Sequence, residues 1–215
     1  MADSGTPPPP PLGPPPEAGV PDESDYPVVV DFDRDDEVAR WRPLVNWLLA
    51  IPQFVVVYLL ALVERALAVL SFFLVLFTTR IPDGIFNFRV MTYRYQWRVT
   101  TFALFMRDEY PPFSFATTPA DDGIDTARLS IRPPGEMNRW LPLVKWILAI
   151  PHYLVLMVLG VGVFFVWIFT FFAVIITGRY PRALRDYVVG VARWGYRVNT
   201  YVLFMTDQYP PFRLS

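Results

Sequence analysis

The sequence repeats itself at a fixed offset of 99 residues. Residues 40–113 align onto residues 139–212 without a gap, and about 31 of these 74 positions are identical. The longest shared runs are L-A-I-P at 49–52 and 148–151, and Y-P-P-F at 110–113 and 209–212. Because chance does not keep such a register, the two copies are predicted to form equivalent units with the same order of elements.

Each copy contains one long apolar stretch, at residues 44–79 and 143–178. Glu64 and Arg65 interrupt the first stretch, and Lys145 is the only formal charge in the second. A membrane-spanning helix needs about 20 apolar residues, and a buried helix of a soluble protein has no need of more. With 53% hydrophobic residues, the chain is therefore predicted to be an integral membrane protein.

Composition excludes several classes of function. Lys and Arg (19) balance Asp and Glu (20), so net charge does not favour nucleic-acid binding. The chain has no Cys, which rules out disulfides, thiol catalysis and thiolate metal sites, and its single His rules out multi-histidine sites. The acidic cluster at 31–37 has no EF-hand spacing and is interpreted as a solvated loop. We expect no cofactor and no metal.

The predicted domain organisation follows from composition and from the repeat. Residues 1–25 form a proline-rich acidic tail, predicted to be disordered, with a ligand for a proline-recognising partner as the functional alternative. Repeat 1 covers residues 26–113, a linker covers residues 114–124, and repeat 2 covers residues 125–215.

Each repeat is predicted to contain four elements, which define an all-α membrane fold with a small strand component. A short β-branched strand (26–32 and 127–131) precedes a short interfacial helix that ends near Pro52 or Pro151. A long transmembrane helix then runs to about Thr79 or Gly178. An amphipathic arm helix follows, which either lies at the membrane interface or packs back on its own spanning helix.

The topology prediction weighs two arrangements of each apolar stretch. A re-entrant hairpin, bending near Val63 and Gly162, keeps the basic segments on one side of the membrane. However, it breaks backbone hydrogen bonds in lipid, at several kcal/mol per group. We therefore predict one continuous helix per repeat and two crossings of the membrane.

Several charged residues are candidate sites. Six arginines, at the helix ends and on the polar stripe of the arms, are candidates for binding anionic headgroups: Arg80, Arg94, Arg98, Arg179, Arg193 and Arg197. Glu64 and Arg65 form a candidate intramembrane polar pair, with either a functional role or a structural ion-pair role. His152, whose counterpart is Gln53, is predicted to make an interfacial hydrogen bond.

The motif that ends each repeat has no assigned role. Its residues are Asp108, Tyr110, Pro111 and Pro112 in repeat 1, and Asp207, Tyr209, Pro210 and Pro211 in repeat 2. A plain helix stop is the favoured interpretation, since proline cannot continue a helix. The alternative is that each aspartate accepts a hydrogen bond from an arginine of its own repeat.

These motifs resemble those of the DUF4389 family. The residues that carry the resemblance are T-G-R-Y-P-R at 177–182, R-W at 193–194 and D-Q-Y-P-P-F at 207–212, with D-E-Y-P-P-F at 108–113. L-A-I-P-H at 148–152 is similar to the actinobacterial members. The resemblance implies a prokaryotic membrane protein and supplies no reaction.

We therefore expect a non-enzymatic, multi-pass protein of the bacterial plasma membrane. Common catalytic and nucleotide-binding motifs are absent from the sequence. The expected role is a structural or accessory subunit that organises lipid or a membrane complex. Its expected partners are the bilayer, anionic lipids, and a membrane protein or a second copy of the chain. The alternative is a small transporter or channel that uses Glu64 and Arg65.

Overall fold

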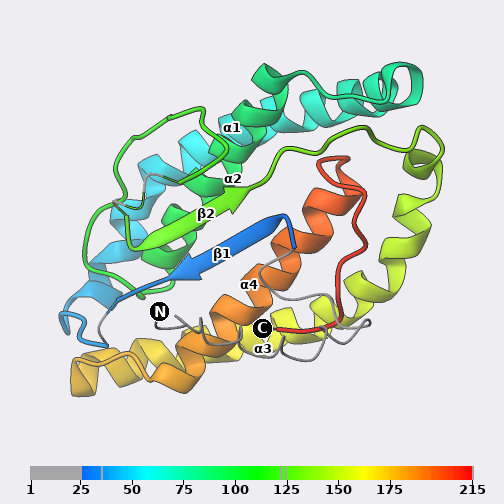
Figure 1. Cartoon of the computed structure of the whole chain (residues 1–215). Coiled ribbons are helices and arrows are strands. Elements are labelled where there is room, and N and C mark those ends of the chain that lie inside the picture. The colour runs from blue at the N-terminus through cyan, green and yellow to red at the C-terminus, as the bar shows by residue number, and fades with distance from the viewer. Residues whose placement is uncertain (1–25, 35, 122, 124, 215) are drawn as a thin grey trace, which may run out of the picture.

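The computed structural model describes residues 26–34, 36–121, 123 and 125–214, so the prediction for the tail at 1–25 lies outside the described residues. Repeat 1 contains β1 (Val28–Phe32), α1 (Arg42–Thr78) and α2 (Asp83–Ala103). Repeat 2 contains β2 (Ala127–Ile131), the short 3-10 helix η2 (Leu141–Leu143), α3 (Lys145–Thr177) and α4 (Arg182–Val202). The described fold is mostly helical and includes a two-stranded sheet (Figure 1).

Helix boundaries follow the 99-residue offset. Both ends of α2 and α4 are 99 residues apart, and so are the ends of α1 and α3 at Thr78 and Thr177. Only the start of the long helix differs, because repeat 2 opens with η2 before α3 begins at Lys145. The duplication predicted from the sequence is confirmed.

The two strands join the repeats across a pseudo-two-fold axis. β1 and β2 pair antiparallel, with Val30 opposite Leu129. These two residues are themselves equivalent under the offset, so the axis passes between them. β1 packs against α4 and β2 against α2, which means that each strand lies on the amphipathic helix of the other repeat (Figure 1).

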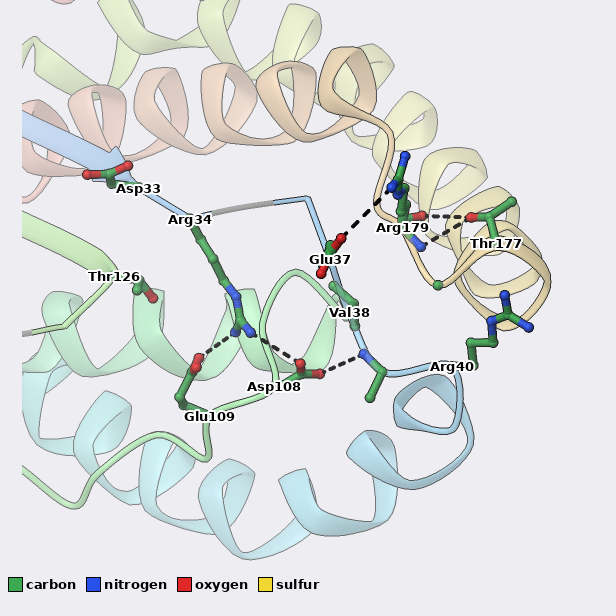
Figure 2. Close-up of a pocket in the computed structure, with 12 residues that line it drawn as sticks. Asp33, Arg34, Glu37, Val38, Arg40, Asp108, Glu109, Thr126, Thr177 and Arg179 are labelled. Atoms are coloured by element: carbon green, nitrogen blue, oxygen red, sulfur yellow. Dashed lines mark hydrogen bonds and ion pairs between the residues drawn. The ribbon is translucent and has the colours of Figure 1, made fainter.

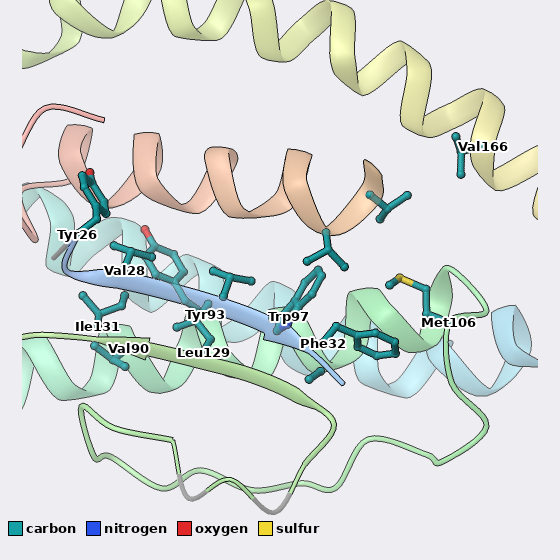
Figure 3. Packing of buried hydrophobic residues seen from close by; sticks show 14 of the residues in the cluster. Tyr26, Val28, Phe32, Val90, Tyr93, Trp97, Met106, Leu129, Ile131 and Val166 are labelled. Atoms are coloured by element: carbon teal, nitrogen blue, oxygen red, sulfur yellow. The ribbon is translucent and has the colours of Figure 1, made fainter. Parts of the chain in front are cut away.

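One face of this sheet forms the core. Val28, Val30 and Phe32 are buried, whereas Val29 between them is 53% exposed. Figure 3 shows the buried strand residues packed against Tyr93 and Trp97 of α2. The opposite face carries Asp31, Arg128 and Ser130, of which Arg128 and Asp31 form an ion pair of 2.7 Å. The sheet is therefore apolar toward the helices and polar on its outer face.

Each long helix is continuous through an internal proline. α1 contains Pro52 and α3 contains Pro151, so the prediction of a separate interfacial helix ending there is wrong. Polar anchors on both sides of Pro52 hold α1 in line, because Asn46 Nδ2 donates to the Phe102 carbonyl (3.1 Å) and Gln53 Nε2 to the Pro111 carbonyl (2.9 Å). The prediction of one unbroken helix rather than a hairpin is confirmed.

The arms return onto their own long helices, since α2 packs against α1 and α4 against α3. Left-handed residues, Thr79 (φ 60°) and Gly178 (φ 71°), terminate the long helices before each reversal. The Met137 N–H donates to the Thr79 carbonyl (2.9 Å), and the Val38 N–H donates to the Gly178 carbonyl (3.0 Å). The start of each long helix therefore lies beside the end of the other.

The outward surfaces of α1 and α3 are apolar. α1 buries one narrow stripe that includes Asn46, Gln53, Glu64 and Ser71, and the rest of its surface exposes Leu, Val, Ile and Phe side chains. Both helices are long and apolar enough to cross a membrane, with mean hydropathies of 2.3 and 2.6 in their most apolar windows. Such surfaces indicate association with a membrane.

Candidate functional site: a charged pair and an apolar cavity beside α1

A buried ion pair connects the middle of α1 to α2. Arg89 is fully buried and donates from Nε (3.1 Å) and Nη2 (2.9 Å) to Oε1 of Glu64. The Tyr93 hydroxyl donates to the same oxygen at 3.3 Å, and Arg89 also donates to Ser71 Oγ at 3.3 Å. These hydrogen bonds offset the desolvation of both charges.

Repeat 2 replaces both charges with apolar side chains. Val163 stands at the position of Glu64, and Val188 stands at the position of Arg89. Removing one partner of a buried pair costs several kcal/mol, whereas replacing both by packed apolar groups is often neutral. The paired change shows that the fold of a repeat does not depend on this ion pair.

The predicted pairing of Glu64 with Arg65 is wrong. Consecutive helical residues point about 100° apart, so Glu64 faces α2 while Arg65 lies on the exposed surface of α1. The true partner, Arg89, was missed. The sequence did contain a signal for it, because opposite charges at 64 and 89 disappear together in repeat 2.

An apolar cavity of about 750 Å³ lies beside this ion pair. Ala68 and Phe72 of α1, Leu203 and Phe204 after α4, and Trp146 of α3 all line it. Its polar lining comes from Glu64, Arg65, Tyr93, Gln96 and Asn199. The volume falls within the usual range for small-molecule sites, about 300–1,000 Å³.

Two differences between the repeats lie at this space. Ala68 occupies the position that Trp167 holds in repeat 2, and Arg65 occupies the position of Phe164. The Trp167 ring stacks on Phe105 with a centroid distance of 6.1 Å. Phe204, the counterpart of Phe105, instead borders the cavity. Repeat 2 therefore fills with an indole the volume that repeat 1 leaves open.

The arm arginines do not form the predicted headgroup-binding stripe. Arg94, Arg98 and Arg197 are buried, because the arms lie beneath the sheet rather than at a lipid surface. Arg94 forms an ion pair with Asp121 (2.9 Å), and Arg98 pairs with Asp121 and Asp125. The guanidinium of Arg197 lies 5.4 Å from the ring centroid of Tyr26.

Two of these arginines hold the sheet on its axis. Arg94 Nε donates to the Leu129 carbonyl (3.0 Å), and Arg193 Nε donates to the Val30 carbonyl (3.1 Å). Each arm thus binds the central residue of the other repeat's strand. Arg193 is half-buried, and its hydrogen bond to the sheet gives it a structural role.

Arg80 and Arg179 remain exposed at the ends of α1 and α3. Arg179 lies 3.9 Å from Glu37, and Arg80 forms an ion pair with Glu136 at 2.5 Å. Both pairs join one repeat to the other. These side chains are about 70% exposed, so they are accessible to headgroups. Their contact with headgroups stays a prediction.

The aspartates of the terminal motif hold the start of each repeat. Asp108 accepts a hydrogen bond from the Ala39 N–H (3.2 Å) and forms an ion pair with Arg34 (3.2 Å). Asp207 accepts from the Asn138 N–H (2.6 Å) and from Lys145 Nζ (2.8 Å). The motif is therefore more than a helix stop, although a lysine replaces the expected arginine in repeat 2.

The aromatic and proline residues that follow these aspartates also pack against the helices. The Tyr209 hydroxyl donates to the Leu148 carbonyl (3.3 Å), and Tyr110 packs edge-on against Phe102. Pro111 and Pro210 are buried, while Pro112 and Pro211 are more exposed. His152 accepts a hydrogen bond at Nδ1 from Trp194 Nε1 (3.0 Å) and stacks on Phe212.

A second, polar recess of about 1,010 Å³ lies where the start of α1 meets the end of α3. Figure 2 shows Arg34 directed at Glu109 and Asp108, with Glu37 facing Arg179. Nearby, Arg182 and Arg185 lower the pKa of the Asp36 carboxyl. Opposite charges here pair both within repeat 1 and between the repeats. The described residues contain no cluster of three metal-ligating side chains.

The fold and the site define a class: a duplicated, mostly helical protein with two lipid-compatible helices and a sheet on its pseudo-two-fold axis. The sequence profile of a domain of unknown function, DUF4389, matches residues 40–114 and 140–213. The chain belongs to the DUF4389 family and contains two tandem copies of the domain. No curated protein and no solved structure matches the chain significantly.

Proposed function

We propose that this chain is a structural or accessory membrane protein that lies within one leaflet and organises lipid or a membrane complex there. In this arrangement α1 and α3 lie along the membrane plane, with their apolar surfaces in lipid. The polar outer face of the sheet then points to water. This orientation replaces the expectation of two crossings.

The position of the sheet on the pseudo-two-fold axis is the observation that carries the proposal. If α1 and α3 crossed in opposite directions, the axis between Val30 and Leu129 would lie at the centre of the bilayer. Asp31 and Arg128 on the outer face would then lie in hydrocarbon. Lipid-exposed sheet edges and irregular loops do not occur at that depth, because each unpaired backbone group costs several kcal/mol.

The lengths of the long helices support the same orientation. α1 has 37 residues and α3 has 33, which correspond to about 55 Å and about 50 Å. The hydrocarbon core is about 30 Å thick. Helices of this length fit along a membrane surface without the steep tilt that crossing requires.

Labelling of introduced cysteines tests this orientation, and the native chain contains no Cys. Gly84 and Ala183 are equivalent, exposed residues that begin α2 and α4 at opposite ends of the molecule. In right-side-out bacterial membrane vesicles, a membrane-impermeant maleimide is expected to give Gly84→Cys and Ala183→Cys the same result. Both are labelled, or both only after the vesicles are opened.

Labelling of the two positions from opposite sides would contradict the proposal and restore the two-crossing topology. Release of the protein from the vesicles by alkaline carbonate would contradict membrane embedding altogether. Each variant serves as the matched control for the other, because both replace a small exposed residue at the same repeat position.

A transporter or channel is the competing function. It loses the support of a Glu64–Arg65 pair, since Glu64 binds Arg89 instead. A flux assay in proteoliposomes separates the two functions. Ion or solute flux above that of empty liposomes, abolished by Glu64→Ala, would favour the transporter.

A further inference from the structure

We propose that the cavity beside Arg65 binds one anionic phospholipid, with an acyl chain against Ala68 and Phe72 and the phosphate at the guanidinium of Arg65. This inference rests on the proposed membrane location. It goes beyond that proposal because it assigns a specific lipid site between α1 of repeat 1 and the end of α4 of repeat 2, on one side of the pseudo-two-fold axis.

The cavity walls fit an acyl chain. Ala68, Phe72, Leu203 and Phe204 form an apolar surface beside an open space of about 750 Å³, against which an acyl chain can lie. Val69 and Phe73 line the same cavity and are themselves exposed on the lipid-compatible surface of α1. The cavity is therefore continuous with the surface that lipid would cover, and a lipid can enter it without crossing water.

The charges at the cavity favour an anion. The carboxylate of Glu64 is neutralised by Arg89, so these two side chains together contribute no net charge. Arg65 adds one positive charge, and within the described residues it has no ion-pair partner at 4.0 Å or less. The side-chain amides of Gln96 and Asn199 add hydrogen-bond donors. A guanidinium with amide donors can bind a phosphodiester, and in an anionic phospholipid no headgroup cation offsets the charge of that phosphate.

Comparison of the repeats argues for a ligand rather than a packing defect. The same fold closes the equivalent space with Trp167, which packs on Phe105, so an indole at this position is compatible with the fold. At position 68 the chain instead carries Ala next to Arg65, where repeat 2 has Phe164. An open cavity and a positive charge thus occur together in repeat 1, and both are absent from these positions in repeat 2.

Native mass spectrometry of the full chain in detergent tests the site. The protein is titrated with dioleoyl phosphatidylglycerol, with dioleoyl phosphatidylcholine, and with oleate in separate arms. We expect one retained phosphatidylglycerol per chain, at least about tenfold preferred over phosphatidylcholine and oleate. Ala68→Trp is expected to weaken retention about tenfold or more, because it introduces the indole that repeat 2 carries.

Ala66→Trp is the matched control, since Ala66 is exposed on α1 and does not line the cavity. Its retention of phosphatidylglycerol is expected to equal that of the wild type. Arg65→Gln keeps the cavity and is expected to reduce the preference for phosphatidylglycerol over phosphatidylcholine by about fivefold. This second variant gives a result even if Ala68→Trp fails to fold.

Equal retention by Ala68→Trp and Ala66→Trp would overturn the inference, as would no retained phospholipid in the wild type. Preferential retention of oleate or of phosphatidylcholine would also overturn it. Flotation of the same variants with phosphatidylglycerol vesicles reports membrane association separately. Failure of the wild type to float with the vesicles would reject the proposed function. Normal flotation without retained lipid would reject only this site.

Discussion

The Glu64–Arg89 pair gives a thermodynamic test at the scale of single residues. Both side chains are buried, and repeat 2 has Val163 and Val188 in their places. The repeats therefore contain two alternative solutions at one pair of positions. A double-mutant cycle measures whether two valines at positions 64 and 89 stabilise repeat 1 as well as the ion pair does.

We predict that Glu64→Val or Arg89→Val alone lowers the free energy of unfolding by about 3–5 kcal/mol, because the remaining charge is buried without its partner. The double variant is expected to lie within about 2 kcal/mol of the wild type. Denaturant unfolding in detergent measures all four proteins. Additive losses in the double variant would show that the two side chains do not act as a pair.

Residue-level prediction from the sequence succeeded where a pattern is local and failed where it depends on burial. The polar role of Glu64 was expected, since a carboxylate in an apolar stretch needs a partner. The wrong neighbour was chosen because adjacency in sequence says nothing of direction around a helix. Likewise, Arg94 and Arg98 were assigned to lipid because a periodic stripe cannot reveal that a sheet covers it.

Within α3, two nearby glycines have different environments and give a test at the scale of elements. Gly162 lies against the side chain of Tyr187 from α4, whose hydroxyl donates to the Leu159 carbonyl at 2.9 Å. Gly160, two residues earlier, has nothing within 4 Å of an added Cβ. From the sequence, Gly162 was considered only as the bend of a re-entrant hairpin.

We predict that Gly160→Ala raises the free energy of unfolding by about 0.5–1 kcal/mol, since alanine favours the helix. Gly162→Ala is expected to lower it by about 1 kcal/mol, because the new methyl group displaces the Tyr187 hydroxyl and its hydrogen bond. Thermal unfolding of the two variants in the same detergent compares them directly. Equal effects would mean that α3 and α4 are not in close contact at Gly162.

The elements themselves were largely predictable. Both strands, both long helices and both arms lie where periodicity and proline signals indicated, since these signals are local. Pro52 and Pro151 are the exceptions, because both long helices continue through a residue that disfavours a helix interior. In α1, hydrogen bonds from Asn46 and Gln53 anchor the helix on both sides of Pro52. Sequence alone could not show those long-range bonds.

At the scale of the whole molecule, the sequence predicts the duplication but not the way in which the two repeats pack together. An ungapped offset predicts two equivalent units, but it does not say that their strands pair with each other. That pairing places β1 on α4 and β2 on α2, and it puts polar groups on the axis between two apolar helices. The sequence-based comparison of hairpins with crossings did not include this arrangement of the sheet, and the two-crossing topology stays a prediction.

The depth of Val29 tests the in-plane orientation most directly. Val29 lies on the outer face of the sheet beside the pseudo-two-fold axis and is 53% exposed. A nitroxide is attached to Val29→Cys in bilayers of phosphatidylglycerol and phosphatidylcholine. Electron paramagnetic resonance then measures how strongly oxygen and a water-soluble nickel chelate each relax the nitroxide. A nitroxide on Leu59→Cys, on the exposed surface of α1, is the lipid-facing control. We predict that the Val29 label is relaxed mainly by nickel and the Leu59 label mainly by oxygen. A Val29 label that oxygen relaxes and nickel does not reach would place the sheet at the bilayer centre and contradict the in-plane orientation.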